Sequence, residues 1–228
     1  MTATAPILAL FDLDHTLLRD DSDEQWVAFL VEKGELDGER FARASDELAA
    51  RYQQGEAGAL EFTEFYLSTL RARAHGELIP LREMFMQERI RPLVPSATRD
   101  LVARHRRLGH LCVLTTGASR FLSEPIAQEL GFEHLIATEP EIVDGRYTGR
   151  VAGTPNMREG KVDRLHAWLD GRGASLAAFS ESWFYSDSQN DLPLLSHVTH
   201  PVAVNADDML AAHARLRGWP QIQIGDRT

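Results

Sequence analysis

The fold is decided by the segment I-L-A-L-F-D-L-D-H-T, residues 7–16. Its apolar part, Ile7 to Phe11, is short and continuous and stops abruptly at Asp12. Such a run is typical of a strand that is buried on both faces of a parallel sheet. We therefore expect residues 7–11 to form a buried strand that delivers Asp12 to one edge of a sheet.

The next stretch, residues 19–91, shows helical periodicity and no convincing strand. Ser22-Asp23-Glu24-Gln25 has the pattern of a capping box, and Gly34 can end the first helix. Apolar residues then recur at helical spacing, at Phe41, Ala44, Leu48, Phe62, Phe65, Leu70, Leu81, Phe85 and Ile90. We expect an all-helical insertion, residues 19–91, between the first strand and the rest of the chain.

Strands and helices alternate beyond Pro92 and Pro95. Strands are expected at 111–115, 135–138, 183–186, 202–204 and around 222–224. Helices are expected at 96–107, between the strand at 111–115 and residue 130, at 161–169 and at 209–216. Asp144-Gly145 predicts the turn of a hairpin over 142–147. This alternation predicts a doubly wound, mostly parallel α/β sheet with right-handed crossovers, built from residues 1–18 and 92–228.

Composition narrows the range of partners. Asp and Glu number 34 and Lys and Arg 24, and the resulting net charge of −10 disfavours nucleic acid or an anionic membrane. The single cysteine, Cys112, excludes an internal disulfide and suits a reducing compartment. No apolar run approaches the ~18 residues of a membrane span, and no signal peptide is recognisable. We expect a soluble, cytoplasmic monomer or homodimer.

Polar residues follow three of the expected strands, and a lysine opens a later helix. They are Asp12, Asp14 and Thr16 after the first strand, Thr116 and Gly117 after the second, Asp187, Asn190 and Asp191 after residues 183–186, and Lys161 at a helix start. Ligands in doubly wound sheets bind beyond the carboxyl ends of the strands. These side chains are therefore expected to converge on one crevice, although turn formation and helix capping would also account for Asp12 and Asp14.

The carboxylates meet the needs of phosphate-monoester hydrolysis. An aspartate at position 12 can attack phosphorus and form an aspartyl-phosphate, while Asp14 can first give and then take a proton. Mg²⁺ prefers oxygen ligands and keeps several waters. Asp12 and Asp187 can supply two carboxylates to it, and a main-chain carbonyl of the Asp14 turn a third oxygen.

The remaining polar groups can stabilise the charge that develops on the phosphoryl oxygens. Lys161 provides a cation, and the Thr116 hydroxyl and the Gly117 N–H provide neutral donors. The sequence therefore predicts a magnesium-dependent phosphatase that acts on a small phosphorylated metabolite.

The order of these four motifs resembles the haloacid dehalogenase superfamily of phosphohydrolases, which has a Rossmann-like core. The helical insertion after the first motif resembles the branch that contains phosphoserine phosphatase and histidinol-phosphatase-like enzymes. The resemblance implies a mobile cap over residues 19–91 that controls substrate choice and water access. It implies catalytic roles for Asp12, Asp14, Thr116 and Lys161, substrate or phosphate contacts for Thr16, Gly117, Asp21 and Asn190, and a Mg²⁺ site at Asp12, Asp14, Asp187 and Asp191.

Two positions bear on the choice of substrate. Asp21 stands where phosphoserine phosphatases commonly carry a glutamate that binds the substrate's amino group, and helix-end electrostatics is the other interpretation of this residue. Arg51 is the candidate for binding a substrate carboxylate.

Three alternatives remain open. A response-regulator receiver domain also carries acids, a threonine and a lysine at strand ends, but it is much shorter and lacks a helical insertion after its first strand. A phosphotransferase would use the same residues with an alcohol as acceptor instead of water. An inactive binding protein is disfavoured because every charged participant is present.

Overall fold

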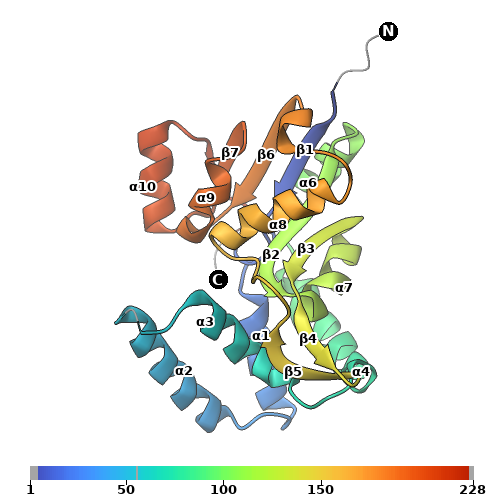
Figure 1. Ribbon diagram of the computed structural model, residues 1–228, viewed down its shortest axis with the longest axis vertical. Helices are drawn as coiled ribbons and strands as arrows, with labels where there is room; N and C mark the ends of the chain where they lie inside the picture. Colours follow the sequence, from blue (N-terminus) through green and yellow to red (C-terminus); the bar gives the residue numbers. More distant parts are fainter. Residues whose placement is uncertain (1–4, 55, 226–228) are drawn as a thin grey trace.

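Six strands form one parallel sheet in the order β3-β2-β1-β6-β7-β8. The computed structural model describes residues 5–54 and 56–225 (Figure 1). The strands are β1 Ile7–Phe11, β2 Leu111–Ser119, β3 His134–Thr138, β6 Glu181–Ser186, β7 His200–Val204 and β8 Gln221–Ile222. The expectation of a doubly wound α/β sheet is confirmed, and β2 is longer than its apolar run predicted.

The first strand lies in the middle of this sheet. Residues Leu8 to Phe11 have no exposed surface, as expected for a strand with neighbours on both sides and helices on both faces. Phe11 is in register with Leu114 of β2 and Tyr185 of β6. β2 and β6 lie on opposite sides of β1. The carboxyl end of β1 is therefore the switch point at which such sheets bind ligands.

Successive residues of β1 point to opposite faces of the sheet and feed two separate hydrophobic clusters. Ala9 and Phe11 belong to one cluster, and Leu8 and Leu10 to the other. Helices cover both faces; they are α6 Ser96–Arg107, α7 Arg120–Leu130, α8 Glu159–Asp170, α9 Leu192–Leu195 and α10 Asp208–Arg217. Short 3₁₀ turns lie at Leu176–Ala178 and Gln189–Asp191.

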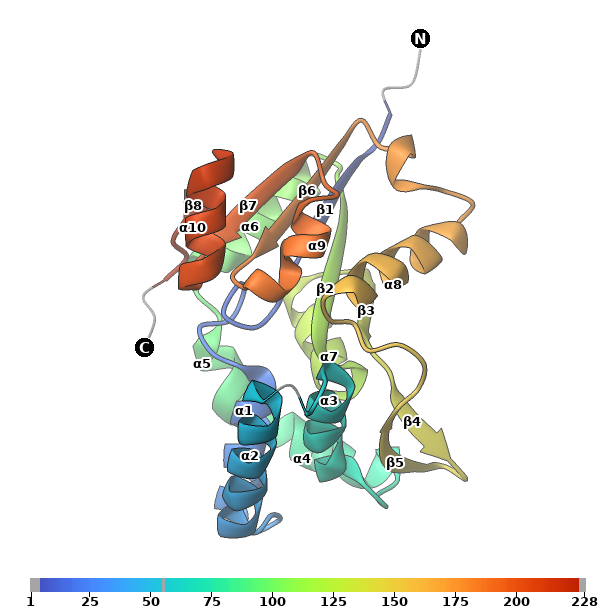
Figure 2. The ribbon, with the colours of Figure 1, turned by 60° about the vertical axis from the view of Figure 1, so that its left-hand side comes forward.

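The segment between β1 and α6 is helical, as predicted, and lies beyond the carboxyl ends of the strands (Figures 1 and 2). Its helices are α1 Ser22–Glu32, α2 Gly38–Gln53, α3 Ala59–Leu67, α4 His75–Phe85 and α5 Arg91–Leu93, with a 3₁₀ turn at Ser68–Leu70 and a π-helical turn at Met86–Ile90. The predicted capping box is wrong. Asp21, not Ser22, caps α1 by accepting hydrogen bonds from the N–H groups of Asp23 and Glu24.

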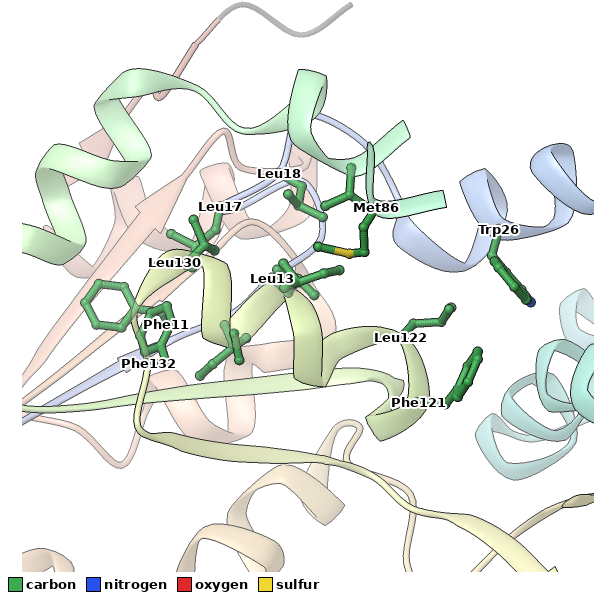
Figure 3. Close-up of a cluster of buried hydrophobic side chains, with 14 of the residues drawn as sticks. Phe11, Leu13, Leu17, Leu18, Trp26, Met86, Phe121, Leu122, Leu130 and Phe132 are labelled. Atoms are coloured by element: carbon green, nitrogen blue, oxygen red, sulfur yellow. The ribbon is translucent and has the colours of Figure 1, made fainter. Parts of the chain in front are cut away.

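One hydrophobic cluster joins the sheet to this helical segment. Figure 3 shows it extending from Phe11 and Phe132 beside the sheet to Trp26 on α1. The ring of Trp26 meets Phe121 of α7 edge-on, with the centroids 5.8 Å apart. The helices around α1 are thus packed against the α/β layers through shared apolar side chains.

The predicted hairpin forms a separate two-stranded sheet of β4 Pro140–Val143 and β5 Arg146–Val151. Asp144 and Gly145 at its turn have φ angles of 51° and 76°, the left-handed values that a type I′ turn requires. The hairpin pairs with the helical segment and not with the main sheet. Tyr147 exchanges main-chain hydrogen bonds with Ala72 and Arg73.

None of the helices in residues 5–54 and 56–225 combines the length and the apolar character needed to cross a membrane.

Candidate active site

A cavity of about 190 Å³ opens at the carboxyl end of β1. We call it the active-site cavity. The predicted site residues that line it are Asp12, Asp14, Asp21, Gly117, Lys161, Asp187, Asn190 and Asp191. Four chain segments that are far apart in the sequence therefore meet in one place, because the parallel strands β1, β2 and β6 end at the same edge of the sheet.

Lys161 forms the centre of the charged network. The first turn of α8 holds it almost fully buried, with 3% of its surface exposed. Its Nζ lies 2.7 Å from Oδ1 of Asp12 and 2.6 Å from Oδ2 of Asp191. Ser186 at the end of β6 donates a hydrogen bond of 2.7 Å to the same oxygen of Asp191. Sequence reasoning drew nothing from Ser186, yet this residue fixes the carboxylate that holds the lysine.

A threonine hydroxyl links the first and last motifs. Oγ1 of Thr16 lies 3.1 Å from Oδ1 of Asp187 and 3.4 Å from Oδ2 of Asp12. Thr16 is buried and does not line the cavity, so it bonds the two carboxylates from the side that faces the protein interior. Asp12 and Asp187 therefore flank a single hydroxyl group at the carboxyl end of β1.

The cavity carries an excess of negative charge. Three buried carboxylates, those of Asp12, Asp187 and Asp191, face one buried cation. Burial raises the pKa of Asp12 to about 6 although Lys161 opposes the shift, and burial with the charges of Asp12 and Asp191 raises the pKa of Asp187 to about 8. Burial alone would lower the pKa of Lys161, but the two carboxylates beside it outweigh burial and raise it.

These oxygen donors fit a hard divalent cation. Mg²⁺ is commonly held by one or two carboxylates together with waters, and the surplus charge of the cavity favours it. In the described part of the chain no group of three or more His, Cys, Asp and Glu side chains is arranged as a metal site. Asp191 is bound by Lys161 and Ser186, and Asp14 accepts from the N–H of Ser22 at 2.7 Å. The ligand roles of Asp12, Asp14, Asp187 and Asp191 therefore stay predictions.

The raised pKa values predict how stability depends on pH in the absence of metal. Asp12 and Asp187 start from an ordinary pKa of 3.8, so between pH 4 and about pH 8 the folded state binds more protons than the unfolded state. With EDTA present, the free energy of unfolding should therefore fall as the pH rises through this window. Chemical denaturation at pH 6 and pH 9 measures it, and Asp187→Asn should reduce the loss above pH 6, to which Asp14 and Asp23 also contribute because their pKa values are raised too. Equal pH dependence in the variant would contradict the prediction.

Asp14 lies in an acidic environment at the start of the helical segment. Burial, together with the charges of Asp21 and Asp23, raises its pKa well above the usual value. A raised pKa makes a carboxyl group a better proton donor to a leaving group. Asp21 also lines the cavity, but both of its hydrogen bonds serve the helix cap and both reach Oδ1.

The structure places Thr116 differently from Gly117. Gly117 lines the cavity, whereas Thr116 is fully buried and its Oγ1 accepts from the N–H of Ala118 at 3.1 Å. Arg51, the candidate for a substrate carboxylate, pairs with Glu61 on α3 and does not line the cavity.

Asn156 is a residue that sequence reasoning missed. It is completely buried and lines the cavity. Its Nδ2 lies within 3.0 Å of Oγ1 of Thr115 and of the carbonyl oxygens of Thr116 and Ile136. It thereby ties the carboxyl ends of β2 and β3 together beside the Gly117 turn. No periodicity or spacing marks an asparagine in a loop for this task.

Arg158, two residues later, is a second cation at the cavity that was missed. Its Nε donates to Oδ1 of Asn190 at 3.1 Å. Its φ of 51° and ψ of −126° lie outside the regions that residues with a side chain normally occupy. Such a conformation costs on the order of 1–3 kcal/mol and persists where the surroundings impose it, often at functional sites.

Known proteins resemble this chain over most of its length. The family model of haloacid dehalogenase-like hydrolases matches residues 9–196. A histidinol-phosphatase of Neisseria meningitidis serogroup C (strain 8013) is 39% identical over 218 residues, which are 95% of this chain and 98% of that protein. Phosphoserine phosphatase SerB1 of Mycobacterium tuberculosis (strain ATCC 25618 / H37Rv) is 31% identical over 92% of this chain and 68% of its own length.

Two solved structures resemble the fold. A crystal structure of a protein with unknown function from Bordetella pertussis Tohama I superposes with a TM-score of 0.91 at 49% identity, over 96% of this chain and 99% of that one. A substrate-bound phosphoserine phosphatase complex superposes with a TM-score of 0.66 at 17% identity, over 100% of this chain and 95% of that one. The second likeness concerns the fold alone.

Proposed function

This chain belongs to the haloacid dehalogenase-like hydrolase family and is a phosphoric monoester hydrolase, and we propose that it hydrolyses small phosphate monoesters with Mg²⁺ through an aspartyl-phosphate on Asp12. The observation that carries the proposal is the network in which Lys161 bonds Asp12 and Asp191 while Asp187 faces Asp12 across one hydroxyl. Family membership removes the receiver-domain alternative.

In the first half of the proposed reaction, Asp12 is the nucleophile. A carboxylate oxygen of Asp12 forms a bond to phosphorus as the bond from phosphorus to the ester oxygen breaks. Asp14, whose pKa is raised by burial and by the neighbouring carboxylates, gives its proton to the leaving oxygen. Lys161 and Arg158 lie at the cavity and offset charge on the phosphoryl oxygens.

In the second half, the roles reverse. Asp14, now a carboxylate, takes a proton from water, and the water oxygen attacks phosphorus. The bond between phosphorus and Asp12 breaks, which releases inorganic phosphate and restores the carboxylate. Mg²⁺, held by Asp12, Asp187 and the main-chain carbonyl of Asp14, would reduce the repulsion between the nucleophile and the anionic ester. The helical segment between residues 19 and 91 acts as a cap that limits water access.

Removal of metal tests the proposal directly. With p-nitrophenyl phosphate as substrate, EDTA should abolish turnover, and excess Mg²⁺ should restore it, whereas Na⁺ at equal ionic strength should not. Asp187→Asn should raise the Mg²⁺ concentration that gives half-maximal rate by roughly 10-fold or more, the scale on which changes around a metal site act. Asp144→Asn at the hairpin turn is the matched control. Full activity in EDTA would exclude the metal-dependent mechanism.

The same assay separates hydrolysis from phosphotransfer. If water is the acceptor, the inorganic phosphate released equals the nitrophenol formed, with or without added glycerol. A shortfall of phosphate when glycerol is present would favour the phosphotransferase.

For the substrate we propose a phosphate monoester whose organic part is cationic, with histidinol phosphate as the first candidate. Asp21 lines the cavity, and Asp23 and Glu24 follow on the first turn of α1, so this acidic group attracts an ammonium group and repels a carboxylate. Histidinol phosphate has an amine and an imidazole and lacks the carboxylate of phosphoserine. The relative named histidinol-phosphatase aligns over nearly its whole length.

Asp21→Asn gives a sharp test of substrate choice, because asparagine caps a helix as well as aspartate does but carries no charge. We expect wild-type protein to prefer histidinol phosphate over phosphoserine by at least ~10-fold in kcat/KM, equivalent to about 1.4 kcal/mol. The variant should lose about that factor with histidinol phosphate and little with p-nitrophenyl phosphate. Equal losses with both substrates would assign Asp21 to the helix cap alone.

A further inference from the structure

A larger cavity, of about 450 Å³, lies at the opposite end of the sheet from the active site. We call it the distal cavity. It is enclosed by the carboxyl end of α6, by the turn after α7 and by the first residues of β2 and β3. Leu111 in the distal cavity and Gly117 in the active-site cavity are six positions apart along β2, which is roughly 20 Å of strand.

The distal cavity is basic in a protein that is acidic overall. Its walls include Arg106, Arg107, His110 and His134, and Glu133 is the acidic residue among them. In the described part of the chain neither arginine has a carboxylate within ion-pair distance. By contrast, Arg91 and Arg99 on the same side of the fold both bind Glu129.

The guanidinium of Arg106 lies against Gly131. Gly131 ends α7 in the left-handed conformation, with φ of 80°. A Cβ atom at position 131 would lie 2.4 Å from Nη1 of Arg106, so the guanidinium occupies the space that a side chain would fill. Arg106 is exposed, and its guanidinium lies at the cavity wall over the main chain of Gly131.

We infer that the distal cavity binds a phosphate-bearing anion through Arg106 and Arg107, with His110 and His134 as further donors. Guanidinium groups match the geometry of phosphate oxygens and form charge-assisted hydrogen bonds with them. The volume lies within the range of small-molecule sites, about 300–1,000 Å³. The activity of the protein supplies such an anion, since it consumes phosphate esters and releases phosphate.

Hydrogen bonds lead from the distal cavity to the side chain of Tyr185, whose main chain pairs with that of Asp12. Nδ1 of His110 lies 2.8 Å from Nδ1 of His105, whose Nε2 lies 2.9 Å from the hydroxyl of Tyr185. The main-chain carbonyl of Tyr185 accepts from the N–H of Asp12 at 2.9 Å. An anion on His110 therefore meets a buried side-chain network that ends at the Tyr185 hydroxyl, and through the position of Tyr185 beside Asp12 we expect occupancy to change kcat.

The test is a titration of ¹⁵N-labelled protein followed by amide chemical shifts. It is done in EDTA, so that it does not depend on turnover, first with inorganic phosphate and then with adenosine monophosphate. The amides of Gly131 and His134 should shift and saturate in the wild-type protein. In R106Q/R107Q the apparent Kd should rise at least tenfold, whereas R215Q on α10, which alters an exposed arginine elsewhere, should behave as wild type.

The outcomes separate the possible ligands and roles. Tighter binding of adenosine monophosphate identifies a phosphate ester as the ligand, and tighter binding of phosphate identifies the reaction product. Unshifted amides, or shifts that survive in R106Q/R107Q, would overturn the site and leave the arginines as partners of the carboxyl end of α6. In steady-state assays phosphate should alter kcat in the wild type and compete only with substrate in R106Q/R107Q. An unaltered kcat in the wild type would overturn the link to Asp12.

Discussion

Asp12→Asn should reduce kcat for p-nitrophenyl phosphate by a factor on the order of 10⁴ or more, the range that loss of a covalent nucleophile reaches in other enzymes. The amide has the shape of the carboxylate but is a poor nucleophile and a weak ligand for Mg²⁺. Asp12 follows β1, is 7% exposed and lies 2.7 Å from Nζ of Lys161. The neighbouring carboxylates are already engaged, Asp191 by Lys161 and Ser186 and Asp187 by Thr16.

The variant should remain folded, which makes the loss of activity interpretable. Lys161 keeps Asp191 as a partner, and the change removes one of three carboxylates that are buried beside a single lysine. In EDTA at pH 8 the free energy of unfolding of Asp12→Asn should therefore not fall below that of the wild type. Initial rates and chemical denaturation measure the two quantities, with Asp144→Asn as control. Activity within tenfold of the wild type would refute covalent catalysis by Asp12.

The sequence was sufficient to predict the strands and the meeting of the motifs. The run that ends at Asp12 is continuous because β1 is buried on both faces, and this periodicity can be read directly. Once the strands are parallel, their carboxyl ends share one edge, and Asp187 must then lie near Asp12. That step uses topology alone and needs no side-chain detail.

The residues that were missed act through contacts that leave no periodic signal. Asn156 bonds carbonyl oxygens of β2 and β3 from a loop, and Arg158 reaches Asn190 across 32 positions of sequence. Ser186 binds Asp191 only because the chain turns back after β6. Each contact depends on the three-dimensional course of a loop, which local propensity does not determine.

The start of α1 shows how a correct chemical pattern can be assigned to the wrong residue. Ser22 was expected to cap the helix, but its N–H instead bonds Asp14 and its buried hydroxyl has no partner among the described residues. Asp21 takes over the cap because its carboxylate reaches the N–H groups of Asp23 and Glu24. The contact of Ser22 with Asp14 thus moves the N-cap of α1 from Ser22 to Asp21.

Lys161→Met is expected to have the largest combined effect on activity and stability. Methionine fills similar space without the charge, so Asp12 and Asp191 would remain buried without their cation. Loss of a preorganised cation at the phosphoryl group should lower kcat by a factor on the order of 10²–10³. Breaking a buried ion pair by removing one partner typically costs about 3–5 kcal/mol, which should appear in the free energy of unfolding in EDTA at pH 8.

Two further variants separate the effect of lost charge from the effect of altered packing. Lys33→Met removes a lysine that pairs with the exposed Glu88, and it should cost at most about 1 kcal/mol. Adding Asp191→Asn to Lys161→Met removes one of the stranded carboxylates, so stability should recover in part while kcat stays low. If the double variant is no more stable than Lys161→Met, the loss came from packing. If Lys161→Met keeps its full kcat, Lys161 serves the fold and does not contact the phosphoryl group.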